Sequence, residues 1–157
     1  MAHYDMLVIG SGPAGQKAAI QAAKIGKKAG VIERKKVAGG ICINTGTIPS
    51  KSLREAVMFL SGFRQRNLYG ASYRVKKDIT FEDLAQRCDH VVKAEQEIIQ
   101  NQLIRNSVDF IVGTASLIDP HRISIKQESE SNEHTADHIV IAVGTETAHP
   151  PGVPFDD

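Results

Sequence analysis

Gly10-Ser11-Gly12-Pro13-Ala14-Gly15 is the stretch of sequence that decides the fold. The apolar, β-rich residues 4–9 run directly into it, as expected for a parallel strand that is buried on both faces. Good helix formers fill residues 13–25, with proline in the first turn and glycine just past the end. Residues 30–33 are typical of a second strand. The sequence therefore predicts a β-α-β unit with a right-handed crossover.

The three glycines of this stretch have different expected roles. Gly10 permits a sharp turn, Gly12 lets a pyrophosphate approach the backbone, and Gly15 lets the helix pack closely on the strand. The free N–H groups at the helix start favour an anion. Glu33, at the end of the second strand, can accept hydrogen bonds from a ribose, and its charge disfavours the 2′-phosphate of NADP. These residues predict a dinucleotide site and leave both NAD and FAD open.

The rest of the chain completes an α/β pattern. In chain order we expect a glycine-bearing loop over 37–41, a helix over 52–60, an irregular polar stretch over 62–78, a long amphipathic helix over 80–103 that starts with a capping box, a parallel strand over 108–112, two antiparallel strands over 115–118 and 122–126, a polar loop over 127–134 and a buried strand over 138–142. The predicted fold class is a Rossmann-like α/β domain with a parallel sheet, a long amphipathic helix and a small antiparallel β-meander, and it is incomplete.

Composition excludes several classes of protein. The 157 residues suit one domain, and 19 Lys+Arg against 18 Asp+Glu give a net charge of +1, so no basic field indicates nucleic acid. No apolar run approaches the roughly 20 residues that span a membrane. The first residues do not resemble a secretory leader, so we expect a cytoplasmic protein. The 2 cysteines are too few for a disulfide framework, and His134 and His138 are not placed to form a metal site.

Residues 39–51 carry a family resemblance. They read Gly-Gly-Ile-Cys-Ile-Asn-Thr-Gly-Thr-Ile-Pro-Ser-Lys, which is similar to the G-G-x-C-x-x-x-x-C-x-P-S-K signature of the pyridine nucleotide–disulfide oxidoreductases. Together with the glycine fingerprint, Glu33 and the strand end at 139–145, the resemblance covers nearly the whole chain. It implies that the first dinucleotide site holds FAD.

The departure from that signature concerns its second cysteine. Thr47 stands where the disulfide enzymes have the partner of Cys42. Residues five apart in an ideal helix lie roughly 8.6 Å from Cα to Cα, too far for a disulfide, so enzymes that form one must unwind this segment. Gly46 and Pro49 retain the means to unwind it. A hydroxyl cannot form a disulfide, so the route to a disulfide substrate is cut.

With Cys42 kept and Thr47 in place of the second cysteine of the signature, the chain resembles the soluble transhydrogenase branch of this family. That branch implies hydride transfer from NADPH through FAD to NAD, which gives NADH and NADP. Cys42 and Lys51 are then the expected catalytic residues, with Lys51 stabilising negative charge near the flavin ring. The cofactor-binding residues expected from the fingerprint and the resemblance are Gly10, Gly12, Gly15, Glu33, Arg34, Gly39, Gly40, Cys42, Lys51 and Gly144.

Only one glycine fingerprint occurs in the chain, whereas the family's members insert an NAD(P)-binding domain and end in a dimerisation domain. We therefore expect residues 1–157 to be the N-terminal part of an FAD-binding domain, inactive alone and part of a homo-oligomer when complete. Two alternatives stay open. One is a dithiol/disulfide oxidoreductase relative that has lost its cysteine pair, and the other is a non-catalytic nucleotide-binding fragment.

Overall fold

The computed structural model describes residues 1–128, 130–146 and 148–154. Its elements, in chain order, are β1 (His3–Ile9), α1 (Pro13–Lys24), β2 (Ala29–Glu33), α2 (Gly40–Asn44), α3 (Thr47–Leu60), α4 (Arg66–Tyr69), α5 (Phe81–Arg105), β3 (Asp109–Val112), β4 (Thr114–Asp119), β5 (Arg122–Gln127) and β6 (Glu130–Ile141). The predicted opening unit, β1-α1-β2, is present, and β1 and β2 pair in parallel. None of the helices within the described residues is long and apolar enough to cross a membrane.

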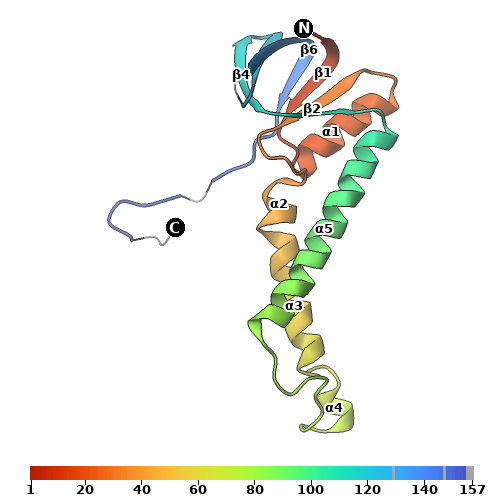
Figure 1. Ribbon diagram of the computed structural model, residues 1–157, viewed down its shortest axis with the longest axis vertical. Coiled ribbons are helices and arrows are strands. Elements are labelled where there is room, and N and C mark those ends of the chain that lie inside the picture. The colour runs from red at the N-terminus through yellow and green to blue at the C-terminus, as the bar shows by residue number, and fades with distance from the viewer. Residues whose placement is uncertain (129, 147, 155–157) are drawn as a thin grey trace.

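All six strands form one sheet in the order β3-β2-β1-β6-β5-β4 (Figure 1). β3, β2, β1 and β6 are parallel, whereas β5 pairs antiparallel with both β6 and β4. Residues 135–141 of β6 pair with β1, and residues 130–135 pair with β5. The predicted fold class is confirmed, with the parallel sheet and the meander joined through β6.

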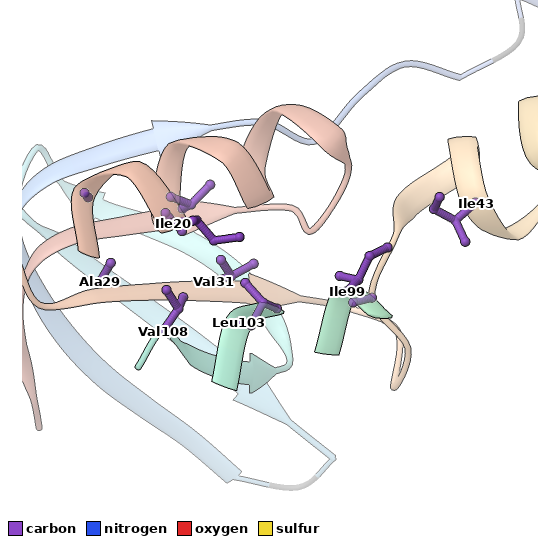
Figure 2. Close-up of a cluster of buried hydrophobic side chains, with 11 residues drawn as sticks. Ile20, Ala29, Val31, Ile43, Ile99, Leu103 and Val108 are labelled. Carbon is purple, nitrogen blue, oxygen red and sulfur yellow. The ribbon is translucent and has the colours of Figure 1, made fainter. Parts of the chain in front are cut away.

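β1 and β2 are covered on both faces, by different partners. Val8 and Val31 lie on the face covered by α1 and α5, where they pack with Leu103 and the other residues of the first core cluster (Figure 2). Their neighbours Leu7 and Ile32 point to the opposite face and pack with side chains of β5. Full burial of each such side chain contributes about 1.5–3 kcal/mol, so this core holds β1 and β2 firmly in the sheet.

α3 and α5 lie side by side and extend away from the sheet as a two-helix arm with α4 at its tip (Figure 1). The long amphipathic helix is confirmed, including the capping box in which Thr80 and Asp83 bond each other's backbone N–H. Its expected apolar stripe is only partly buried. Ile99 and Leu103 are buried beside the sheet, whereas Ile98 is 47% exposed. Most of α5 extends beyond the sheet, where its main packing partner is α3.

Two expected boundaries around the first helix of the arm are wrong. α3 begins at Thr47 rather than at residue 52, and α2 starts inside the stretch expected to be a loop. Pro49 is the third residue of α3, where a backbone N–H has no partner within the helix, so proline is tolerated there. The stretch expected to be irregular also contains the short helix α4.

The polar loop expected over 127–134 is mostly strand, with residue 129 outside the described residues. β6 begins at Glu130 and pairs with β5, and polar side chains suit it because this end of the strand is exposed. The buried strand expected over 138–142 is likewise the exposed-to-half-buried end of β6, with Ile141 61% exposed. Local sequence pattern does not report this long-range pairing.

Candidate functional site

The turn between β1 and α1 needs glycine at two positions for different reasons. Gly10 has φ +104°, and a Cβ there would collide with the carbonyl oxygen of Ala142 after β6. Gly15 has no room for a Cβ because the Gly10 carbonyl oxygen occupies that space. Both expected structural roles are therefore confirmed: Gly10 makes the sharp turn, and Gly15 lets α1 pack against β1.

Gly12 differs from both because the space beside it is open. A Cβ at Gly12 would meet nothing within 4 Å, and its φ of −65° is accessible to any residue. Gly12 is the N-cap of α1, and within the described residues no side chain caps that helix end and no acid lies in its first turn. The first N–H groups of α1 therefore face an open, locally positive space that suits an anion.

Glu33 lies at the end of β2 and bonds back to the glycine turn. Its Oε2 accepts hydrogen bonds from the Ser11 backbone N–H at 3.0 Å and from the Ser11 hydroxyl at 2.6 Å. Its Oε1 accepts one from the backbone N–H of Lys35 at 3.1 Å. Burial raises the pKa of the Glu33 carboxyl, but these hydrogen bonds outweigh burial and hold that pKa below its ordinary value. The acid is therefore charged at neutral pH.

Ser11 and Gln16 are site residues that the sequence did not predict, and both are buried. Gln16 Nε2 donates to the Ser11 carbonyl oxygen at 2.6 Å. The Gly39 N–H donates to both the hydroxyl and the carbonyl oxygen of Ser11, each at 3.2 Å. Ser11 occupies a variable position of the fingerprint, so the only available signal was a polar residue between two glycines.

Gly39 and Gly40 bring a second turn against the first. Their φ values are +119° and +61°, and a Cβ on Gly40 would lie 2.9 Å from the Cα of Gly12. A side chain at Gly40 would therefore push the two turns apart. The structure thus gathers Gly10, Gly12, Gly39 and Gly40 beside Glu33, at the end of the sheet where β1 and β2 finish.

Cys42 and Thr47 lie on different helices. Cys42 is a half-buried free thiol in α2, and Thr47 is the first residue of α3. The break between the helices falls at Gly46, whose φ of −112° and ψ of −111° are not helical, whereas Pro49 lies within α3. Lys51 lies exposed on α3, one turn beyond Thr47.

Asn44 is the last residue of α2, its side chain bonds back to the start of that helix, and the sequence did not predict it either. Its Nδ2 donates to the carbonyl oxygens of Gly40 at 2.9 Å and Ala38 at 3.3 Å. Its Oδ1 accepts from Gln96 Nε2 of α5 at 2.6 Å. The amide therefore ties the turn before Cys42 to the arm.

Arg34 and Gly144 lie at the margins of this gathering. Arg34 is exposed and lines a hollow of about 730 Å³ together with Lys36, Thr114 and Lys126 among others. Gly144 has φ +75°, is exposed, and follows Ala142, the residue against Gly10, by two positions. A Cβ there would meet nothing within 4 Å, so the space beside Gly144 is open.

A buried strand, a glycine turn, a helix with an uncapped start and a second strand that ends in a charged acid define a Rossmann-like dinucleotide-binding domain. Residues 4–156 match the model of the pyridine nucleotide-disulphide oxidoreductases. The chain belongs to that family.

Individual relatives agree with this assignment. The soluble pyridine nucleotide transhydrogenase of Mycobacterium tuberculosis (strain ATCC 25177 / H37Ra) is 55% identical over 159 residues, which cover 100% of this chain and 34% of that protein. The corresponding protein of Photorhabdus laumondii is 39% identical and covers 98% and 33%. The Cu(II) complex of the HOCl-induced flavoprotein disulfide reductase RclA from Escherichia coli has a TM-score of 0.79 at 28% identity, over 96% of this chain and 31% of that one. The chain spans about a third of the length of these relatives.

Proposed function

We propose that this chain forms the N-terminal part of the FAD-binding domain of a soluble transhydrogenase, which transfers hydride from NADPH through FAD to NAD and gives NADH and NADP. Identity of 55% with a mycobacterial soluble transhydrogenase supports the proposal. In this proposal, residues 1–157 contribute the FAD site, while the nicotinamide nucleotides bind to a domain outside these residues. Phe155 to Asp157 lie outside the described part of the structure.

The residues of the glycine turns fit FAD. The open space at Gly12 and the uncapped start of α1 would take the pyrophosphate, because backbone N–H groups there can approach it closely. Glu33 would accept hydrogen bonds from the adenosine ribose. The hollow that Arg34 lines would take the adenine end of FAD, because Arg34 directly follows Glu33, the proposed contact of the adenosine ribose. When bound, FAD supplies the group that accepts and returns the hydride.

The remaining proposed contacts come from the second turn and the helices that follow it. Gly39 and Gly40 let their backbone lie against the cofactor, and Gly144 would approach it from the end of β6. Cys42 and Lys51 are the proposed catalytic residues, with the Lys51 ammonium favouring negative charge near the flavin ring. Thr47 stands five residues after Cys42, so the proposed role of Cys42 is that of a single thiol in contact with the cofactor and not half of a disulfide.

The observation that carries transhydrogenation over disulfide reduction is Thr47 at the start of α3. The helix break that a disulfide between Cys42 and position 47 would need is present at Gly46, yet Thr47 cannot be oxidised to a disulfide or exchange with a dithiol. The second candidate, a dithiol/disulfide oxidoreductase relative, is favoured by the fold match to RclA. It predicts that Thr47→Cys restores disulfide reduction.

Two assays on the native protein, as its gene encodes it, separate these candidates. The first follows NADPH-dependent reduction of the thionicotinamide analogue of NAD, and the second follows NADPH- or NADH-dependent reduction of oxidised lipoamide and glutathione. We expect activity in the first assay alone, for both wild type and Thr47→Cys. Disulfide reduction by wild type, or its appearance in Thr47→Cys, would instead favour the second candidate.

The proposal includes a homo-oligomer of the complete protein and a cytoplasmic location, and both stay predictions. Light scattering of the native protein tests the first, and cell fractionation tests the second.

A further inference from the structure

Ser11 bonds to both sides of the junction between the two glycine turns, and its exposed fraction is 0%. Its hydroxyl donates to Glu33 Oε2 at 2.6 Å and accepts from the Gly39 N–H at 3.2 Å. A hydroxyl has one proton to donate, and here that proton goes to the acid. The same oxygen therefore contacts the end of β2 on one side and the start of α2 on the other.

The chain between those two elements does not hold them by itself. Residues 34–37 connect Glu33 to the second turn, and all four are exposed. The hydrogen bonds of Ser11 span this exposed connection from the inside, where water is excluded. A charged acceptor makes the bond to Glu33 the strongest of them.

We propose that Ser11 is a positioning residue of the FAD site, which acts through Glu33 by holding carboxylate Oε2 so that Oε1 is presented to the ribose of the cofactor. This inference rests on the proposed function. The two oxygens of the carboxylate thereby have separate tasks: one orders the protein and the other binds the ligand.

The acceptor capacity of the carboxylate supports this division. Each oxygen of an ionised carboxylate accepts about two hydrogen bonds. Oε2 accepts two, both from Ser11, and Oε1 accepts one, from the Lys35 N–H, while the Arg34 N–H adds the smallest of the hydrogen-bond effects on the carboxylate. The remaining capacity therefore lies on Oε1. The hydroxyl of Ser11 also lowers the pKa of Glu33, against the opposing effect of burial, which keeps that acceptor charged.

Removal of the hydroxyl should affect Glu33 more than the second turn. In Ser11→Ala the Gly39 N–H keeps its bond to the carbonyl oxygen of residue 11, and Glu33 keeps the backbone N–H of residue 11. The variant loses the hydrogen bond from the hydroxyl to the charged Glu33 and the weaker of the roles of that hydroxyl, which is to accept from the Gly39 N–H. We expect FAD affinity to fall about tenfold, since bonds to charged partners are among the stronger ones.

A double-mutant cycle on the native protein, freed of flavin and titrated with FAD, tests the inference. Dissociation constants are measured for wild type, Ser11→Ala, Glu33→Ala and the double variant. We expect Ser11→Ala to change affinity less than about threefold when Glu33 is already alanine, because its partner is then gone. Ser61→Ala is the matched control, since that hydroxyl donates to the backbone carbonyl of Met58 on the arm at 3.4 Å, and the variant should bind FAD as wild type does.

The outcomes are distinguishable. An equal loss from Ser11→Ala in both backgrounds, or no loss in either, overturns the positioning role while leaving the proposed function intact. A wild type that binds no FAD contradicts the proposed function, and the inference falls with it. If Ser11→Ala does not fold by circular dichroism, Ser11→Cys replaces it, because a thiol is a weak donor of similar size. It should give a smaller loss that also vanishes in the Glu33→Ala background.

Discussion

Glu33 is subject to two opposing influences on one carboxyl group. Burial favours the neutral form, while hydrogen bonds from the Ser11 hydroxyl and from backbone N–H groups favour the charged form. The combined effect of the hydrogen bonds is larger than that of burial, so the pKa of Glu33 lies below its ordinary value. A charged, half-buried acid at this edge of the sheet is therefore an acceptor held ready for a hydroxyl donor.

Glu33→Ala is predicted to weaken FAD binding by about 1 to 3 kcal/mol, or roughly tenfold to a hundredfold, because hydrogen-bonding groups lose their partner. Titration of the flavin-free native protein with FAD measures the change. An affinity equal to that of wild type would mean that the ribose contact lies on another residue.

His134 in β6 gives a prediction for pH dependence. Its Nδ1 is buried without a hydrogen-bond partner among the described residues, and its ring lies 6.0 Å from that of Tyr4. Burial, with smaller effects from the N-terminal amine and Lys28, lowers the pKa of His134 below 6.5. The unfolded chain therefore takes up a proton at this residue that the folded chain does not, as pH falls below about 6.5.

We accordingly expect the free energy of unfolding of wild type to fall relative to that of His134→Gln as pH is lowered from 7 toward 5. Urea unfolding of both proteins at several pH values measures this difference, in which the titration of all other groups largely cancels. A difference that stays constant with pH would show that His134 is not held neutral by the fold.

Residue types alone predicted some site residues and not others. Gly10 and Gly15 were identified because the backbone at these positions leaves room only for glycine. The glycines of such a turn also occur at a fixed spacing in the sequence, which makes the pattern recognisable. Ser11 and Asn44 were missed because their partners are 22 and 52 residues away in the chain. Their importance comes from contacts that no local pattern reports.

At the scale of elements, the ends of helices decide the geometry of the site. α1 begins without a side-chain cap, next to the open space at Gly12, whereas α5 begins with a complete capping box. The contrast fits the proposed anion site, because a bound anion would satisfy the N–H groups at the start of α1, whereas the side chains of α5 satisfy their own. The break at Gly46 similarly separates α2, which carries Cys42, from the arm.

The cap of α5 can be tested by removing either partner. Thr80→Ala should destabilise the protein by about 1 kcal/mol, and Thr80→Ser, which keeps the hydroxyl, by much less. Urea unfolding followed by circular dichroism measures both. Equal losses in the two variants would argue against the hydroxyl as the source of the effect.

The acid of the same cap should act in a defined pH window. Hydrogen bonds from Lys76 first, and then from Thr80, lower the pKa of Asp83 from 3.8 to about 2. Its contribution to stability is therefore present above pH 3.8 and is lost as pH falls toward 2. The stability difference between wild type and Asp83→Asn should shrink across that window, and a difference that persists at pH 2 would contradict this assignment.

For the whole molecule, the site lies where the arm meets the sheet. The sequence predicted some elements of the sheet and the arm more closely than others. β1-α1-β2 was predicted closely because strand, glycine and helix signals are local. The extent of β6 and the exposure of α5 were not, since both depend on which distant element lies alongside. Figure 1 shows the arm leaving the sheet just after the second glycine turn, which places Cys42 between the two parts.

Binding of FAD to wild type, Gly12→Ala and Gly15→Ala tests the central claim most directly. The two alanine variants add the same methyl group, at Gly12 into open space and at Gly15 into the Gly10 carbonyl. We predict saturable binding of FAD by wild type. We expect Gly12→Ala to fold as wild type does but to bind FAD at least about tenfold more weakly. We expect Gly15→Ala to lose both stability and FAD binding. Absence of saturable FAD binding by wild type, or wild-type affinity in Gly12→Ala, would contradict the account.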